Sequence, residues 1–120
     1  MASHALLRLF QANKPAFGAW LTIPNTFVAR IMAQASPHLS WMVIDCEHGL
    51  IPLVPGAAEI VAGVQGAVPN GGPTVIVRIP ATGVTASSSW QIKHALDAGA
   101  QGVLIPLVCK KKKKNSLFWF

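Results

Sequence analysis

The sequence predicts an α/β fold in which parallel strands alternate with helices. Short apolar runs rich in β-branched residues recur at a spacing of roughly 25 to 30 residues, with helical patterns between them. Such a spacing suits right-handed βαβ units, whose strands lie parallel in one sheet. The runs are apolar on both faces, so helices must cover one side of the sheet and further strands the other. We therefore expect a partial TIM (β/α)8-type barrel, with an N-terminal helix and roughly the first four of eight strands.

The first elements follow from apolar runs and their stop signals. A short N-terminal helix that Ser3 can cap ends at residues 13–15, Asn-Lys-Pro. Residues 17–23 predict the first strand. Residues 26–35 predict a helix that Pro37 stops, and we expect its apolar face to carry Phe27, Ile31 and Met32, with Ala29 and Ala33 close beside them.

The second half of the pattern repeats strand, helix and strand. Residues 41–45 and 74–78 predict the second and third strands, and residues 102–106 predict the fourth. Helices are expected at residues 56–66 and 90–98, the latter capped by serines before it and stopped by Gly99. The side chains expected to face the core from these two helices are Ile60, Val61, Val64, Ile92, Ala95 and Leu96.

Charge divides the chain into a near-neutral body and a basic tail. Of the 120 residues, 52% are hydrophobic and 12% are charged, so a buried core is expected and disorder is not. Lys110–Lys114 supply half of the ten basic residues, and the rest of the chain holds five basic residues against four acidic ones. We therefore expect residues 1–108 to form the N-terminal half of a barrel. Residues 109–120 are expected to be an aberrant lysine-rich tail, such as a missed splice or a frameshift would produce.

The remaining composition bears on partners and location. The near-neutral body offers no basic face for nucleic acid, and no apolar run is long enough to span a bilayer, so neither partner is expected. A tail that binds anionic membrane or RNA through its lysines and aromatic end stays open as an alternative. Cys46 and Cys109 have no metal-type spacing, and we find no signal peptide, which together favour a cytoplasmic protein.

Ionisable residues stand where two of the predicted strands end. Asp45, Glu47 and His48 follow the second strand, and Arg78 closes the third. The carboxyl ends of parallel strands meet at one edge of a sheet, where α/β proteins place their chemistry. The alternative is structural: Asp45 caps the next helix, and Glu47 and His48 are ordinary loop residues.

Four ordered motifs carry a resemblance to a known family. They are residues 17–20 (Phe-Gly-Ala-Trp), 41–49 (Trp-Met-Val-Ile-Asp-Cys-Glu-His-Gly), 75–80 (Val-Ile-Val-Arg-Ile-Pro) and 91–102 (Gln-Ile-Lys-His-Ala-Leu-Asp-Ala-Gly-Ala-Gln-Gly). Together, over about residues 5–108, they resemble the metal-dependent pyruvate aldolases of the 4-hydroxy-2-oxoheptanedioate aldolase and citrate lyase β-type (HpcH/HpaI) family.

The resemblance implies roles for four residues. His48 corresponds to the catalytic histidine of the family, Asp45 to an active-site acid beside it, and Arg78 to the arginine that faces pyruvate and its enolate oxygen. Asp97 corresponds to the acid that partners the histidine. Its helix runs antiparallel to the strands, however, so we expect Asp97 at the opposite end of the sheet, where it would reach only a neighbouring subunit's site or act locally.

The resemblance also implies a cofactor, a substrate and an assembly. The family uses a divalent metal, Mg²⁺ or Mn²⁺, to hold pyruvate, but its metal-ligating carboxylates lie beyond the end of the match, so the metal ligands in this chain are unknown. A small 2-oxo acid is the implied substrate and a homo-oligomer the implied assembly. The chemistry would be that of a carbon–carbon lyase, a class II pyruvate aldolase that cleaves a 4-hydroxy-2-oxo acid to pyruvate and an aldehyde, incomplete in this chain.

Two alternatives stay open at this point. In the first, the chain is a non-catalytic truncated fragment that self-associates. In the second, the chain has lyase chemistry, but of the citramalyl- or malyl-CoA lyase type. The sequence shows no basic patch suited to a CoA pyrophosphate, which disfavours the second. The identity of the aldehyde is not set by these motifs.

Overall fold

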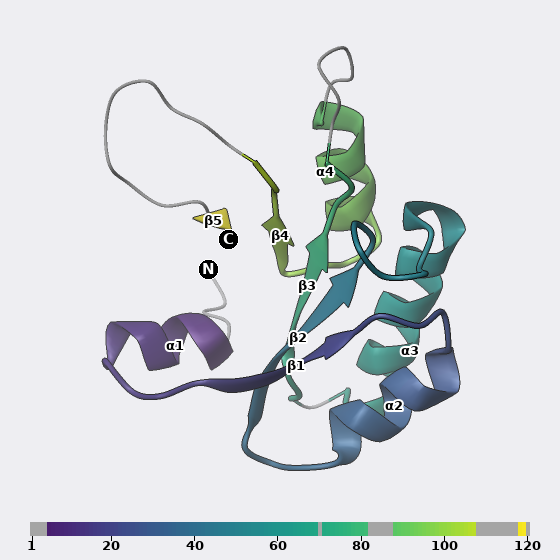
Figure 1. Cartoon of the computed structure of the whole chain (residues 1–120). Coiled ribbons are helices and arrows are strands. Elements are labelled where there is room, and N and C mark those ends of the chain that lie inside the picture. The colour runs from purple at the N-terminus through teal and green to yellow at the C-terminus, as the bar shows by residue number, and fades with distance from the viewer. Residues whose placement is uncertain (1–4, 70, 82–87, 108–117, 120) are drawn as a thin grey trace, which may run out of the picture.

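The computed structural model describes residues 5–69, 71–81 and 88–107 and the short strand 118–119 (Figure 1). In chain order its elements are α1 (Ala5–Gln11), β1 (Phe17–Leu21), α2 (Thr26–Gln34), β2 (Leu39–Asp45), the wide turn η1 (Leu53–Ala57), α3 (Ala58–Ala67), β3 (Thr74–Arg78), α4 (Ser89–Asp97), β4 (Gly102–Leu104) and β5 (Phe118–Trp119).

The sheet confirms the predicted α/β fold class. Strands β1 to β4 lie side by side in sequence order, and each pairs parallel with the next. Sequential parallel strands joined by helices form the first part of a TIM-barrel-like fold. All four predicted strands exist, although β1 and β4 end earlier than their apolar runs suggested and β2 starts two residues sooner.

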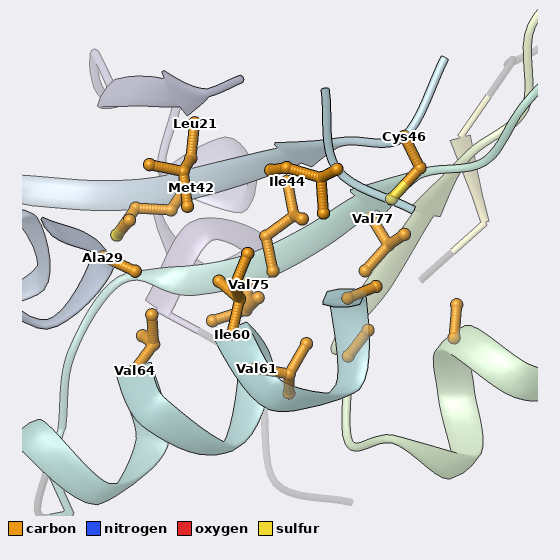
Figure 2. Close-up of a cluster of buried hydrophobic side chains, with 14 of the residues drawn as sticks. Leu21, Ala29, Met42, Ile44, Cys46, Ile60, Val61, Val64, Val75 and Val77 are labelled. Carbon is orange, nitrogen blue, oxygen red and sulfur yellow. The ribbon is translucent and has the colours of Figure 1, made fainter. Parts of the chain in front are cut away.

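One face of the sheet, which we call the outer face, lies under α2, α3 and α4 (Figure 1). Alternate strand residues point into this layer because successive side chains of a strand face opposite ways. Figure 2 shows the strand residues meeting Ile60, Val61 and Val64 of α3, as predicted for that helix. The strand residues buried there include Leu21, Met42, Ile44, Val75, Val77 and Val103. This layer forms the main core of the described chain.

The opposite face, the inner face, has a much smaller cover. Leu6 of α1 packs with Val43 and Ile76 in a second, separate cluster. Trp41 lies on this face too, and a Cβ on Gly18 would stand 1.8 Å from its ring, so only glycine leaves room there. The α1 helix is therefore the element that covers the middle of the inner face.

The packing of α2 differs from our expectation. Phe27 and Ile31, predicted on the apolar face, are exposed by 71% and 53%, whereas Ala29 and Ala33 are buried. The cause is the close approach of α2 to α3: a Cβ on Gly63 would stand only 2.3 Å from the Thr26 methyl. Small residues lie at this close approach, Phe27 and Ile31 point to solvent, and Met32 packs against the core as predicted.

The α4 helix also departs from the prediction in detail. Leu96, expected in the core, is 49% exposed, and Gln91 is buried together with Ala95. Ser88 precedes the helix without a side-chain capping bond. Gly99 does end the helix as predicted, with a φ of 96° that favours glycine.

The predicted tail, residues 109–120, lies outside the described residues except for β5. This strand pairs antiparallel with β4, with Val103 opposite Trp119 and Leu104 opposite Phe118. The division at residue 108 therefore stays a prediction. Among the helices that the structure describes, none is both long and apolar enough to cross a membrane.

Candidate active site

The paired strands β2 and β3 bring two opposite charges together. Their register places Asp45 directly opposite Arg78, the last residue of each strand. Both alternate with the outer-face residues Ile44 and Val77, so both belong to the inner face. The predicted meeting of polar side chains at the carboxyl edge of the sheet is thus present for these two residues.

The carboxylate of Asp45 is saturated by hydrogen bonds. Arg78 donates from Nε to Oδ1 at 2.8 Å and from Nη2 to Oδ2 at 2.6 Å, a bidentate pair. The backbone N–H groups of Glu47 and His48 also donate to Oδ1, at 3.0 and 3.1 Å. Asp45 therefore fixes both the guanidinium and the loop that carries the next two ionisable residues.

That loop is pressed against the backbone of its neighbours. A Cβ on Gly49 would stand 2.3 Å from the Asp45 carbonyl oxygen, so a glycine is required. The Leu50 N–H donates to the Thr22 carbonyl oxygen at 2.7 Å, which ties the loop to the end of β1. The Cys46 N–H donates to the Arg78 carbonyl oxygen at 2.9 Å and continues the ladder between β2 and β3.

The electrostatics of the pair are those of a buried ion pair. The hydrogen bonds from Arg78 outweigh the burial of Asp45 and lower the pKa of this carboxyl to about 2. The same pair raises the pKa of Arg78. Asp45 is 2% exposed and stays ionised at neutral pH, so it neither gives nor takes a proton there.

Two more side chains surround the guanidinium. The Arg78 Cζ lies 4.6 Å from the centre of the Trp20 ring, a cation–π contact. Glu47 Oε2 lies 3.4 Å from Arg78 Nε. The arginine is therefore held by Asp45, Glu47 and Trp20, and its side chain is 20% exposed.

His48 stands at the rim of this cluster. Its side chain is 72% exposed, and its Nε2 lies 3.6 Å from Glu47 Oε2. The predicted neighbours Asp45, His48 and Arg78 are thus together, with Asp45 bonded to the backbone of His48 rather than to its ring.

Asp97 does not join them. It is the last residue of α4, which leads through Gly99 to the start of β4, and so it lies at the amino end of the strands (Figure 1). Its carboxylate is 61% exposed and pairs with Lys93 on the same helix. Within one chain, its role at the His48 site stays a prediction.

The donor atoms near Arg78 do not form a complete metal site. Among the described residues no three His, Cys, Asp or Glu side chains gather in a group that could hold a metal ion. Both carboxylate oxygens of Asp45 accept hydrogen bonds from Arg78, and Oε2 of Glu47 lies near the same guanidinium. A guanidinium beside the remaining carboxylate disfavours a second cation, so these residues do not fit the divalent metal of the resemblance.

The thiol of Cys46 is not a candidate nucleophile. Burial, together with the charge of Asp45, raises its pKa to about 11, so at neutral pH it stays a neutral thiol in the core.

A large hollow lies elsewhere, at the amino end of the strands. It measures about 1020 Å³ and is open to solvent between α1, the end of α2 and the loops before β2 and β3. Asp45, Glu47, His48 and Arg78 do not line it, so we place the candidate chemistry at the shallower carboxyl edge.

Sequence reasoning underestimated two members of the site. Glu47 was left without a role, although it contacts both Arg78 and His48. Trp20 appeared only as the last residue of the first motif, although its ring contacts Arg78. A usable signal was the scarcity of charge: with four acidic residues and three arginines in the chain, two acids next to one histidine suggest a local network.

Comparison with known proteins identifies the proteins that this chain resembles. The chain is 32% identical over 106 residues to hydroxypyruvate/pyruvate aldolase of Agrobacterium fabrum (strain C58), spanning 88% of this chain and 35% of that protein. It is 30% identical over 115 residues to 4-hydroxy-2-oxo-heptane-1,7-dioate aldolase of Klebsiella pneumoniae, spanning 88% and 36%. No family model matches the chain.

Solved structures agree with the curated relatives. A HpcH/HpaI aldolase/citrate lyase family protein from Burkholderia cenocepacia J2315 superposes with a TM-score of 0.72 at 26% identity, covering 88% of this chain and 38% of that one. The chain matches the N-terminal part of HpcH/HpaI-type aldolases in sequence and in fold. Macrophomate synthase also superposes, with a TM-score of 0.68 at 30% identity, over 87% of this chain and 32% of that one.

The match covers only part of each relative, so it does not assign the activity of the whole relative to this chain. The chain spans about a third of the length of the curated aldolases that it matches. The resemblance is to lyases, and the part shared with them contains the Asp45–Arg78 pair and the loop with Glu47 and His48.

Proposed function

We propose that this chain supplies one corner of a carbon–carbon lyase that cleaves a 4-hydroxy-2-oxo acid into pyruvate and an aldehyde. The observation that carries the proposal is the guanidinium of Arg78, held rigidly at the carboxyl edge by two hydrogen bonds to a buried carboxylate. The names of the relatives support the reaction class, because both types of curated relative are aldolases.

Arg78 has donors left for a substrate. A guanidinium has five N–H groups, and Asp45 takes one from Nε and one from Nη2. The two N–H groups of Nη1 and the second of Nη2 have no hydrogen-bond partner among the described residues. Because Asp45 compensates the charge of Arg78, recognition would rest on these directed donors more than on net charge. They suit the oxygens of a 2-oxo acid and of its enolate.

The proposed cleavage needs one base and one oxyanion partner. His48, exposed at the rim, accepts the proton of the C4 hydroxyl as the C3–C4 bond breaks and the aldehyde forms. The electron pair of that bond passes into the C2–C3 enolate, whose oxygen takes hydrogen bonds from Arg78. The protonated His48 then returns a proton to C3, which gives pyruvate and restores the neutral imidazole. In this scheme Asp45 holds Arg78 in place and carries no proton.

A second candidate function is a self-associating fragment without catalysis. Among the described strands β1 pairs only with β2, so its other edge is open. Beside this edge the large side chains of α2 are exposed, and open strand edges next to apolar surface promote association. This candidate shares the fold and the Asp45–Arg78 pair but predicts no turnover.

The experiment that separates the two is pyruvate release from a 4-hydroxy-2-oxo acid by the purified chain, with Mg²⁺ or Mn²⁺ added because the resemblance implies a divalent metal. Turnover that His48→Ala and Arg78→Lys abolish would support the lyase. His38→Ala is the matched control, since His38 is an exposed histidine away from the site. Sedimentation velocity on the same samples tests the alternative: a chain that forms oligomers or larger aggregates and releases no pyruvate with either metal is the non-catalytic fragment.

The proposal extends to partners and location. It includes a small 2-oxo acid as substrate, a homo-oligomer as the working assembly and a cytoplasmic setting. The free, buried thiol of Cys46 suits a reducing compartment.

A further inference from the structure

We propose that Glu47 is the positioning residue for His48, a role that the resemblance gives to Asp97. This inference rests on the proposed function, because it concerns the same histidine, and it names the carboxylate that sets the tautomer of that ring.

The chain has only four acidic residues, and the structure describes all of them. Asp45 has no free capacity, since its oxygens accept four hydrogen bonds. Glu59 lies in the first turn of α3, and Asp97 ends α4 in a pair with Lys93. Within the part of the chain that the structure describes, Glu47 has the one carboxylate at ion-pair distance from the His48 ring, at 3.6 Å.

The two residues differ in how firmly they are held. The Glu47 side chain is 9% exposed and its Oε2 lies between Arg78 Nε at 3.4 Å and His48 Nε2 at 3.6 Å. Asp45 fixes the backbone of both residues by accepting their N–H groups. Glu47 is therefore a nearly buried anchor, and His48 is an exposed ring attached to it.

This geometry assigns the proton on the neutral imidazole. The separation of 3.6 Å is just longer than a hydrogen bond. Once it shortens, the ring nitrogen that faces the carboxylate must carry the hydrogen, because a carboxylate only accepts. Nε2 faces Glu47, which leaves Nδ1 with a free lone pair. Nδ1 is then the atom that takes the proton of the C4 hydroxyl, and Glu47 stabilises the imidazolium that results. Apo separations of this kind shorten when a site is occupied.

The decisive experiment is the ¹⁵N spectrum of the histidine rings in the full chain, with the His48 signals assigned by their loss in His48→Ala. We expect the wild type to show the tautomer with hydrogen on Nε2. Glu47→Gln should shift the population away from a single form and toward the mixture of a free imidazole, in which Nε2–H is still the larger part, because a neutral amide no longer selects one nitrogen. Asp97→Asn and Glu59→Gln are the matched controls, each removing one carboxylate charge, and should leave the His48 signals in place.

Two outcomes overturn the inference. Unchanged His48 signals in Glu47→Gln would show that Glu47 does not set the tautomer. A change in Asp97→Asn would assign the role to Asp97, reached across an interface. Neither spectrum requires turnover, so the failure of the lyase assay would refute the proposed function without touching this result. Where turnover is present, we expect Glu47→Gln to lower kcat on the order of 10²-fold with little change in KM.

Discussion

The two faces of the sheet differ in packing and in charge. The outer face meets three helices and buries a continuous set of aliphatic side chains, with Cys46 as the one titratable residue among the buried members of that cluster. The inner face has a small cluster around Leu6 and, at its carboxyl edge, the ion pair of Asp45 and Arg78. One face thus supplies the free energy of folding, while the other holds the candidate chemistry with little packing around it.

The largest expected effect comes from breaking the inner-face ion pair. Arg78→Leu leaves the buried Asp45 carboxylate with its two backbone hydrogen bonds but without a counter-charge, and we expect it to lower the free energy of unfolding by about 3–5 kcal/mol in chemical denaturation. The double variant Asp45→Leu/Arg78→Leu is the control. It should lose much less, because the fully buried carboxylate of Asp45 is removed together with its counter-charge. Equal losses in the single and double variants would show that the pair itself, rather than the orphaned charge, stabilises the fold.

A matched pair of core truncations compares the two faces directly. Ile44 is 0% exposed on the outer face of β2, and Ile76 is 6% exposed on the inner face of β3. We expect Ile44→Ala to lower the free energy of unfolding by about 3–4 kcal/mol, as in well-packed cores, and Ile76→Ala by about half as much. Similar losses would mean that α1 packs the inner face as tightly as the helices pack the outer one.

Acid should destabilise the fold by protonating Asp45 on the inner face. The pKa of Asp45 is lowered to about 2 in the folded chain, below the value of the unfolded chain near 3.8. The unfolded chain therefore binds more protons in that range, and about 2 kcal/mol of stability is lost as the pH falls from about 4 to about 2. Urea denaturation at a series of pH values measures this. Asp45→Asn should flatten the slope in this range, and an unaltered slope would assign the acid sensitivity to other groups.

The smallest expected effect concerns the aromatic contact of the guanidinium. Trp20→Leu removes the ring 4.6 Å from Arg78 Cζ and should lower the free energy of unfolding by about 0.5–1 kcal/mol. Trp90→Leu is the matched control, since Trp90 is 55% exposed on α4 and has no cation–π contact among the described residues. Equal losses for both tryptophans would show that the contact contributes only apolar burial.

The fold class was predictable because strand order and parallel direction follow from local patterns. Residues 74–78 show this best: a β-branched run that ends in Arg78 gave the bounds of β3 without error. The burial of α2 was not predictable in the same way. Periodicity identifies an apolar face, but Gly63 lies against Thr26 because two helices approach closely, and that approach is a tertiary property.

The candidate site was likewise predictable only in part from the sequence. The position of Asp45, His48 and Arg78 at one edge followed from their places at strand ends. Their partners did not, because the pairing of Asp45 with Arg78 depends on the register of β2 against β3, and the contacts of Glu47 depend on loop geometry. Local sequence specifies neither of these.

The antiparallel pairing of β5 with β4 has a topological consequence. A barrel of parallel strands closes only if each edge receives a neighbour that runs in the same direction. The edge of β4 is occupied by Phe118–Trp119 running the opposite way, over two residue pairs. Among the described strands the sheet is a ribbon with β1 at one edge and the antiparallel β5 at the other, so the far side of β4 is already paired. Any parallel strand that extends the sheet beyond β4 must first displace those two residues.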